Sequence, residues 1–395
     1  MKQYICIDIG GTSIKYGVIQ EDGTFLTTGE MPTEAQQYGG PGIMEKAKRI
    51  IETYKTEYHP EGICISTAGM VDCEKGKITY ASPLIPDYTG TEIKAELEKC
   101  YGIPCEVEND VNCAGLAECF AGASKGSKIS VCLTIGTGIG GSIIIDGKVF
   151  HGFSGSGCEV GYMHLPGGEF QDLGASSILV KKTAEYKNLS PDSIDGKYVF
   201  AQAKQGDRDC IRAIEEMCQI LGMGIANICY VVNPEVVVLG GGIMAQKEYL
   251  KDLLRKGLDK YLIPSVAKHT RLAFAENQNQ AGMLGAFYHF KGRHQGLDKE
   301  AVWNHTKRIL FLRLRQFMVI SHLLRRILRI FLFTMRKRWI YLPRAYQKGC
   351  MCQRPPFPDL RKNVVIRATE NLFSAMSRED RAASKNQAVI TLSGY

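Results

Sequence analysis

The sequence predicts an α/β fold built from two related domains, and three observations lead to this. Segments with a strand-like pattern alternate with segments of helical periodicity along most of the chain. A unit of strand, glycine-rich turn and strand occurs twice, at residues 3–20 and again at 128–149. The composition is ordinary for a globular protein, with 45% hydrophobic and 23% charged residues in 395. Together these features favour two layered domains that face each other.

The first predicted domain begins with three strands and continues with alternating strands and helices. The segment 62–67 is a continuous apolar run, which is typical of a buried parallel strand. Three leading strands followed by alternation indicate a mixed sheet. The expected elements, in order, are strands at 3–9, 14–20 and 24–28, a helix at 42–57, a strand at 62–67, a helix at 91–100 and a strand at 105–109.

The second domain repeats this pattern after a connecting helix at 111–123. Its expected elements are strands at 128–135 and 142–149, a long helix at 207–231, a strand at 235–239 and a helix at 279–291. We assign residues 1–112 to an N-terminal lobe, joined by the helix 279–292, and residues 113–278 to a C-terminal lobe. Met217 and Tyr230 have the spacing of core residues on the long helix.

Residues 295–395 differ from the rest of the chain in charge and in pattern. They contain 20 basic and 6 acidic residues, whereas residues 1–294 contain 29 basic and 35 acidic ones. The acidic body argues against nucleic acid as a partner. The extension lacks a binary pattern, and the longest uncharged stretch within residues 309–342, at 316–324, is too short to cross a bilayer. We interpret it as a basic extension without an evolved fold; the alternative is an amphipathic helix for membrane surfaces.

The 14 cysteines are scattered, and no secretory signal precedes them. This usage predicts reduced thiols and a cytoplasmic protein. Four of the cysteines lie inside apolar runs, where Cys acts as a small hydrophobic residue: Cys6, Cys64, Cys132 and Cys229. The chain has no Cys-x-x-Cys pair, so the sequence offers no convincing zinc spacing.

Three glycine clusters are candidate nucleotide-binding elements. The turn Asp8–Thr12 and the turn Gly136–Gly141 each join two strands, and together they would hold one polyphosphate from two sides. Asp8 beside such a turn would repel phosphate unless a cation intervened, so it is a candidate partner of Mg²⁺, directly or through water. The cluster Gly240–Gly242 ends a buried strand and would admit a flat group such as adenine. Each cluster taken alone also fits an ordinary turn.

A single carboxylate, Asp110, lies between these clusters in the sequence, where a strand ends and a helix begins. As a helix N-cap it would have only a structural role. As a functional residue it would accept a proton from a substrate hydroxyl that attacks the terminal phosphate of a nucleotide. In either role the helix N-terminus predicts a low pKa for this carboxyl.

Six motifs in order resemble the ROK family of the actin/hexokinase superfamily, over about residues 1–294. They are DIGGTSIKYGVI (8–19), ISTAGMVD (65–72), VENDVNCAGLAE (107–118), LTIGTGIGGSII (133–144), HGFSGSGCEVGYMHL (151–165) and NQAGMLGAF (279–287). The resemblance implies two ribonuclease-H-like (actin/hexokinase-type) domains with a cleft between them, and the activity of an ATP- and Mg²⁺-dependent sugar kinase.

The resemblance also implies a role for individual residues. Asp110 would be the general base and would contact the sugar together with Gly69, Asn109 and Glu159. A remaining sugar ligand falls at Gln171 or Asp172, and the sequence leaves this open. The residues expected to bind ATP are Asp8, Gly10, Gly11, Thr12, Thr137, Gly138, Gly140, Gly141, Gly240, Gly241 and Gly242.

The chain departs from the family pattern at the zinc site that many members carry. The zinc-binding His is replaced by Tyr162, and residues 166–175 contain no Cys. We therefore expect no zinc site, and a loop held by packing through Tyr162 and Phe170. His151 and His164 lie nearby and are expected to be solvated.

The predicted function is phosphorylation of a hexose hydroxyl, with the 6-position of glucose first. The alternatives are a β-glucoside kinase and an N-acetylmannosamine kinase. A sugar-responsive regulator is not expected, because only seven residues precede Asp8 and leave no room for a helix-turn-helix. The resemblance implies a homodimer. We expect no nucleic-acid partner and no membrane contact through the extension.

Overall fold

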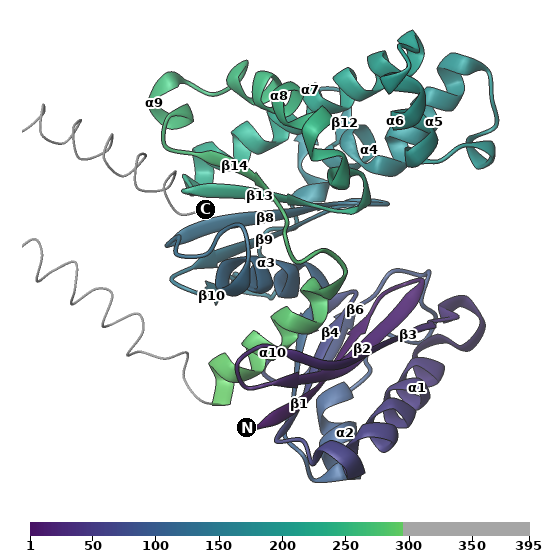
Figure 1. Cartoon of the computed structure of the whole chain (residues 1–395), viewed down its shortest axis with the longest axis vertical. Coiled ribbons are helices and arrows are strands. Elements are labelled where there is room, and N and C mark those ends of the chain that lie inside the picture. Colours follow the sequence, from purple (N-terminus) through teal and green to yellow (C-terminus); the bar gives the residue numbers. More distant parts are fainter. Residues whose placement is uncertain (295–395) are drawn as a thin grey trace, which may run out of the picture. The chain divides into compact units, whose positions relative to one another are not determined.

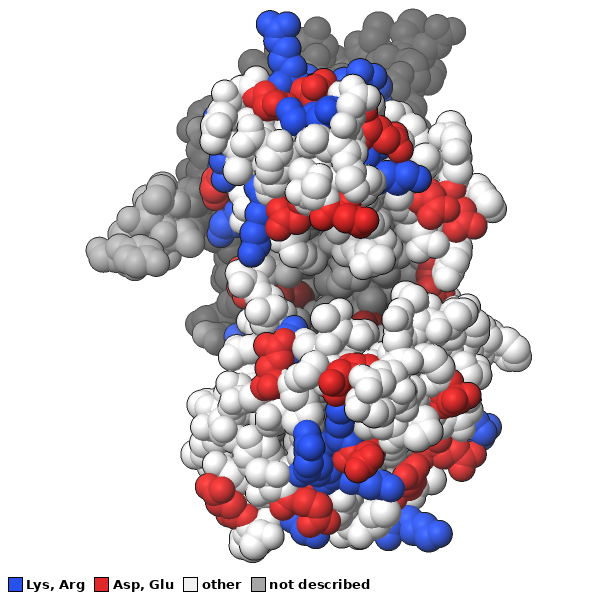
Figure 2. Space-filling view, turned by 90° about the vertical axis from the view of Figure 1, so that its right-hand side faces the viewer, with Lys and Arg blue, Asp and Glu red and all other residues white. Residues whose placement is uncertain are grey.

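The computed structural model describes residues 1–294, and the prediction of a basic extension at 295–395 lies outside the described residues. Residues 1–294 have a mixed α/β fold, as predicted, with two five-stranded sheets (Figure 1). Acidic and basic side chains are interspersed on the face shown in Figure 2. No helix of the described part is both long and apolar enough to cross a membrane.

The first sheet has the order β3-β2-β1-β4-β7. Strand β2 is antiparallel to both of its neighbours, β1 and β3, whereas β4 and β7 run parallel to β1. The bounds are Gln3–Ile9 for β1, Ser13–Gln20 for β2, Phe25–Pro32 for β3, Gly62–Thr67 for β4 and Cys105–Asn109 for β7. The mixed sheet is therefore confirmed, and β4 and β7 have the bounds that the sequence predicted.

Alternation along β1 divides its side chains between two hydrophobic layers. Ile5, Ile7 and Ile9 pack in one cluster with residues of α1 (Ala35–Tyr58) and α2 (Ile93–Tyr101). Tyr4 and Cys6 belong to another cluster with α10 (Ala281–His294). The sheet is thus covered on both faces, with α1 and α2 on one side and α10 on the other (Figure 1). A small two-stranded sheet, β5 (Met70–Asp72) and β6 (Lys77–Tyr80), was not expected.

The second sheet has the order β10-β9-β8-β13-β14 and the same mixture of directions. Strands β8 and β9 are antiparallel, whereas β13 and β14 run parallel to their neighbours. The bounds are Ile129–Ile135 for β8, Ile139–Ile145 for β9, Lys148–Val149 for β10, Val236–Gly240 for β13 and Arg271–Phe274 for β14. The repeat of strand, glycine turn and strand therefore has the same place in both sheets.

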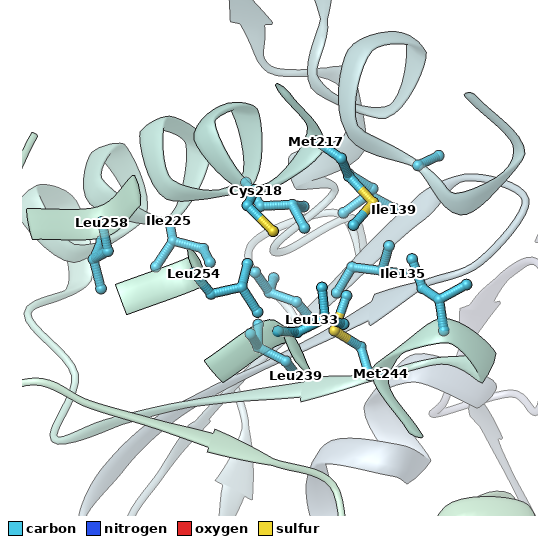
Figure 3. Packing of buried hydrophobic residues seen from close by; sticks show 14 of the residues in the cluster. Leu133, Ile135, Ile139, Met217, Cys218, Ile225, Leu239, Met244, Leu254 and Leu258 are labelled. Atoms are coloured by element: carbon cyan, nitrogen blue, oxygen red, sulfur yellow. The ribbon is translucent and has the colours of Figure 1, made fainter. Parts of the chain in front are cut away.

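One face of the second sheet carries the larger core. Leu133 and Ile135 of β8 pack against Met217, Cys218 and Ile225 of α7, as Figure 3 shows. The helices and short turns of this part are α4 (Phe170–Gly174), α5 (Ser176–Lys187), α6 (Gly196–Lys204), α7 (Arg208–Val232), α8 (Lys247–Asp259), α9 (Pro264–Ala267), η1 (Val160–Tyr162), η2 (Pro191–Ser193), η3 (Gly242–Gln246) and η4 (Gln278–Gln280), with the two-residue strands β11 (His164–Leu165) and β12 (Gly168–Glu169).

Helix α10 packs against the first sheet and also against α3 (Asp110–Ala121). The two helices approach so closely that a Cβ added at Gly285 would overlap the carbonyl oxygen of Cys113. Helix α3 also contacts the second sheet, because Gly115 lies against Ser142 of β9. The pair α3 and α10 therefore links the two sheets. The division into lobes at residue 112 stays a prediction.

Two local expectations from the sequence are wrong. The predicted strand 142–149 is two strands separated by a turn at Asp146 and Gly147, and β9 already begins at Ile139, so Gly140 and Gly141 are strand residues. Tyr230 is 47% exposed rather than in the core, because its hydroxyl donates to the carbonyl of Tyr261 and accepts from the amide of Ile263 at the surface. The four cysteines predicted to be hydrophobic core residues are buried.

Candidate active site

Three parallel strands of the first sheet bring polar residues to one edge. Asp8 of β1 lies opposite Ser66 of β4, and Thr67 of β4 lies opposite Asn109 of β7. Because β1, β4 and β7 are parallel, their carboxyl ends meet at the same edge of the sheet. The carboxyl edge of a parallel sheet is where α/β proteins commonly bind ligands.

Asp8 is held inside this edge. The Ser66 hydroxyl donates to its carboxylate over 2.6 Å, and Gly282 of α10 packs directly on its carboxyl group. Burial raises the pKa of Asp8 above its ordinary value. The following residues Gly11 and Thr12 are exposed, whereas Thr33 donates its hydroxyl to the carbonyl of Gly10 and its amide to that of Thr12. The first turn is thus anchored through its carbonyls and open on its outer side.

Helix α3 is capped by Asn109 and not by Asp110. The Asn109 side-chain oxygen accepts hydrogen bonds from the amides of Val111 (2.9 Å) and Asn112 (3.1 Å). Its amide nitrogen donates to the Gly69 carbonyl and to the Asp110 carboxylate. The expected N-cap role of Asp110 is therefore wrong, because the preceding Asn takes the cap and leaves Asp110 in the first helical turn.

The low pKa expected for Asp110 is also wrong. Burial, together with the negative charge of Asp8, raises the pKa of Asp110 to about 7. Hydrogen bonds from the Val111 amide and from Asn109 act in the opposite direction and are outweighed. Desolvation thus exceeds the effect of the helix N-terminus at this position. A carboxyl with a near-neutral pKa is suited to accept a proton at physiological pH.

The second glycine turn is fixed by the start of α5. Ser176 donates its amide and hydroxyl to the Gly136 carbonyl, and Ser177 donates its hydroxyl to the Thr137 carbonyl. Gly140 leaves space for Val111, since an added Cβ would lie 2.6 Å from that side chain. Val111 follows Asp110 directly, and the negative charge of Asp8 is one cause of the raised pKa of Asp110. The segment 110–111 therefore lies between elements of both glycine turns.

The third glycine cluster adjoins the second turn. Gly240 pairs with Thr134 near the end of β8. Gly241 has φ +105°, and a Cβ there would overlap the carbonyl oxygen of Ile135. Gly242 has open space where a side chain would be, and it begins η3. The backbone at Gly240–Gly242 is therefore a loop that starts a short helix, which is the plain alternative that the sequence offered. A role of these glycines in binding adenosine stays a prediction.

The predicted sugar ligands come from three segments. Gly69 has φ +102°, and its carbonyl accepts from Asn109. Glu159 is an exposed residue, and the partial desolvation of its carboxyl raises its pKa above the ordinary value. The Gln171 side-chain oxygen lies 3.0 Å from where a Cβ would stand on either Gly138 or Gly161, whereas Asp172 is exposed. Of the two alternatives for the last ligand, Gln171 is therefore placed beside the second turn at Gly138.

The sequence analysis missed an ion pair at this edge. His151, expected to be solvated, lies with its Nε2 atom 2.7 Å from Oε2 of Glu108, whose side chain is only 1% exposed. Burial alone would raise the pKa of Glu108, but His151 and its other partners lower it to about 2. His164 is exposed, as expected, and so is Tyr162, whereas Phe170 is fully buried. Of the two residues expected to hold this loop by packing, Phe170 is therefore the buried one.

The residues at this edge fit the magnesium ion that the resemblance implies. Asp8 and Asp110 are partly buried carboxyls close enough for one charge to affect the other. Hard carboxylate oxygens are the ligands that Mg²⁺ prefers, and a cation would compensate their mutual repulsion. Asp8 is the better candidate to hold it, directly or through water, because it borders the exposed turn at Gly11 and Thr12.

Two repeated mixed sheets, each with a glycine turn after its first strand, define an α/β protein of the actin/hexokinase fold. A family model described as "ROK family" matches residues 4–293, and the chain belongs to the ROK family. The order of the six motifs was thus sufficient to find the family.

Several known proteins resemble the chain over nearly their whole length. An uncharacterized protein of Clostridium perfringens is 55% identical over 291 residues, covering 74% of this chain and 98% of its own length. A glucokinase of Thermotoga maritima is 31% identical over 313 residues, with coverage of 74% and 98%. A solved ROK glucokinase of Streptomyces griseus, in complex with glucose and AMPPNP, has 29% identity and a TM-score of 0.64, covering 72% of this chain and 97% of that one.

Proposed function

We propose that the protein is an ATP- and Mg²⁺-dependent kinase that phosphorylates a hexose hydroxyl, with the 6-hydroxyl of glucose as the first candidate. The observation that carries this proposal is Asp110: a partly buried carboxyl of near-neutral pKa, fixed at the start of α3 between elements of two glycine turns. The kinase relatives and the AMPPNP-bound neighbour support it, since AMPPNP is an analogue of ATP.

In this mechanism the substrate hydroxyl oxygen attacks the γ-phosphorus of ATP. The new O–P bond forms as the bond to the β–γ bridging oxygen breaks, and ADP leaves. Asp110 accepts the proton of the hydroxyl on its carboxylate. Phosphoryl transfer depends mainly on positioning and charge stabilisation, so a base of modest strength is sufficient. Bound Mg²⁺ would neutralise phosphate charge.

The remaining residues bind and orient the substrates. Asn109 already uses its amide to fix Gly69 and Asp110, so it would set the position of the sugar relative to the base. Glu159 and Gln171 would accept or donate hydrogen bonds to other hydroxyls, and an epimer would leave one such group unpaired. Backbone amides near Gly10–Thr12 and Thr137–Gly138 would bind the phosphates, and Gly240–Gly242 the adenosine.

A second candidate is a β-glucoside kinase. A β-glucoside kinase of Klebsiella pneumoniae is 31% identical to the chain over 303 residues, as close as the Thermotoga glucokinase. The position of Gln171, an amide where many family members are expected to carry a Glu, favours a changed hydroxyl pattern at the sugar. An N-acetylmannosamine kinase is a further alternative within the same mechanism.

A sugar panel with coupled ADP detection tests these proposals. Glucose, N-acetylmannosamine, fructose, allose and cellobiose are compared at equal concentrations, each with and without Mg²⁺. The proposal expects the highest kcat/KM with glucose, and preference for cellobiose would select the β-glucoside kinase. ADP release that no sugar stimulates would contradict the kinase assignment. Light scattering after size exclusion tests the expected homodimer, and fractionation of the source cell tests the expected cytoplasmic location.

A further inference from the structure

Three potential metal ligands from distant parts of the sequence meet beneath the predicted sugar site. Cys73 follows β5, Glu108 lies in β7, and His151 begins the segment after β10. The Cys73 sulfur, a Glu108 carboxylate oxygen and a His151 ring nitrogen all lie within 4.8 Å of one another. None of the three belongs to Tyr162 and residues 166–175, the segment that corresponds to the zinc loop of other family members.

The contacts within this group converge on one atom. His151 Nε2 lies 2.7 Å from Glu108 Oε2 and 3.5 Å from Cys73 Sγ. In a nucleophile–histidine–carboxylate triad the two partners use different ring nitrogens. Here a single nitrogen has both partners, so the group does not fit a triad. A metal ion placed between the three atoms would satisfy them all at once.

The separations are close to those of a tetrahedral zinc site. Zn–S bonds of about 2.3 Å and Zn–N bonds of about 2.0–2.1 Å place the sulfur and nitrogen roughly 3.5 Å apart at a tetrahedral angle. The observed Sγ to Nε2 distance is 3.5 Å. The oxygen and nitrogen, now at hydrogen-bond distance, would separate by about 0.6–0.8 Å on binding.

The carboxylate of Glu108 is already oriented by neighbouring groups. Its Oε1 atom accepts from the Asn109 amide (2.8 Å) and from the Asn112 side chain (3.0 Å). His289 Nδ1 lies 3.3 Å from Oε2, and in the described residues the buried Nε2 of His289 has no hydrogen-bond partner. Outer groups that fix a ligand in this way are characteristic of metal sites.

We propose that Cys73, Glu108 and His151 bind a Zn²⁺ ion, with water in the fourth position. The donor set of sulfur, nitrogen and oxygen suits zinc better than Mg²⁺ or Ca²⁺, which prefer oxygen alone. The ion ties together three segments that carry predicted sugar ligands: the strand after Gly69, the strand before Asn109, and the loop leading to Glu159. We expected no zinc because the chain has no Cys-x-x-Cys pair and lacks the zinc ligands of the family's loop. Neither observation concerns Cys73, Glu108 and His151.

Metal titration of the purified full-length protein tests the site without any kinase assay. The protein is reduced, stripped with a chelator and titrated with Co²⁺, then with Zn²⁺ in competition. We expect about one equivalent of Co²⁺ with a thiolate-to-metal charge-transfer band, which Zn²⁺ abolishes. Zinc content after stripping and reloading gives a second measure. Absence of this band in the wild type, or of zinc after reloading, would overturn the proposal.

Matched variants identify the ligands. Cys73→Ala should abolish the charge-transfer band, and His151→Gln should weaken Co²⁺ binding at least tenfold. Cys158→Ala removes another half-buried thiol, one outside the group, and should bind Co²⁺ like the wild type. Circular dichroism confirms that each variant is folded. A band that persists in Cys73→Ala, or wild-type affinity in His151→Gln, contradicts the site. Neither outcome depends on the identity of the sugar.

Discussion

Replacing Asp110 by Asn separates the proposed catalytic role of this residue from its cost to stability. The pKa of Asp110 is about 7 in the folded protein, against an ordinary value of 3.8. The native state therefore binds this proton more tightly than the unfolded chain does. Its contribution to stability is fully present below pH 3.8 and is lost as the pH rises through about 7. The whole difference corresponds to about 4 kcal/mol.

Asp110→Asn should consequently be more stable than the wild type at pH 8. Asn keeps the oxygen that accepts from the Val111 amide and from Asn109, but carries no charge to bury. We expect a gain of about 1–4 kcal/mol in the free energy of unfolding at pH 8, shrinking towards pH 4. Urea unfolding at both pH values measures it. Asp146→Asn, at an exposed turn, is the control and should change stability little at either pH.

The same substitution should remove most of the turnover. Loss of the general base is expected to lower kcat by about 10²–10⁴, with sugar binding retained in calorimetry. In the wild type kcat/KM should fall as the pH drops below about 7, where the Asp110 carboxyl becomes protonated. Near-normal turnover in Asp110→Asn would remove Asp110 from the base role. Equal stability of variant and wild type at pH 8 would refute the buried-charge reasoning.

Three further predictions concern the elements around the site. Asn109→Ala should cost about 1–2 kcal/mol in urea unfolding and raise the KM for sugar, because the cap of α3 and the contact to Gly69 are lost. Gly285→Ala should cost about 3 kcal/mol, since its Cβ would overlap the Cys113 carbonyl, whereas Gly11→Ala, with open space at its Cβ, should not lower the melting temperature. A chain ending after His294 should remain folded and active. A chain ending after Gly292 should have a melting temperature lower by a few degrees, because it loses the ion pairs of Arg293 with Glu74 and of His294 with Glu106.

Patterns that depend on neighbouring residues were read correctly from the sequence. The apolar run 62–67 and the segment 105–109 are strands with the predicted bounds. The first is buried along its whole length, whereas the second carries two glutamates and is buried except at Asn109. The placement of Asp110 at the start of a helix was also correct. The four-residue strand β14 carries too short a pattern to be distinguished from a loop.

Properties that depend on distant residues were not predictable in this way. The pKa of Asp110 rises through burial and through Asp8, a residue a hundred positions away in the first turn. The role of His151 depends on Glu108, which reaches it only after β7 has joined the sheet. Tyr230 has core spacing on α7, but it lies on the last turn, where the helix reaches the surface. In each case the tertiary environment outweighs the local pattern.

Strand β7 connects the two sites that we propose. Glu108 points to the face covered by α10, whereas Asn109 caps α3 and holds Gly69. The Glu108 carboxylate contacts residues of both proposed sites. Its Oε2 atom faces His151, and its Oε1 atom accepts a hydrogen bond from the Asn109 amide. An ion bound at Oε2 would fix the carboxylate and, through that hydrogen bond, the backbone directly before Asp110. Loss of the ion should therefore raise the KM for sugar more than it lowers kcat, because Asn109 and Glu159 would position the substrate in the proposed mechanism while Asp110 keeps its own contact to Val111.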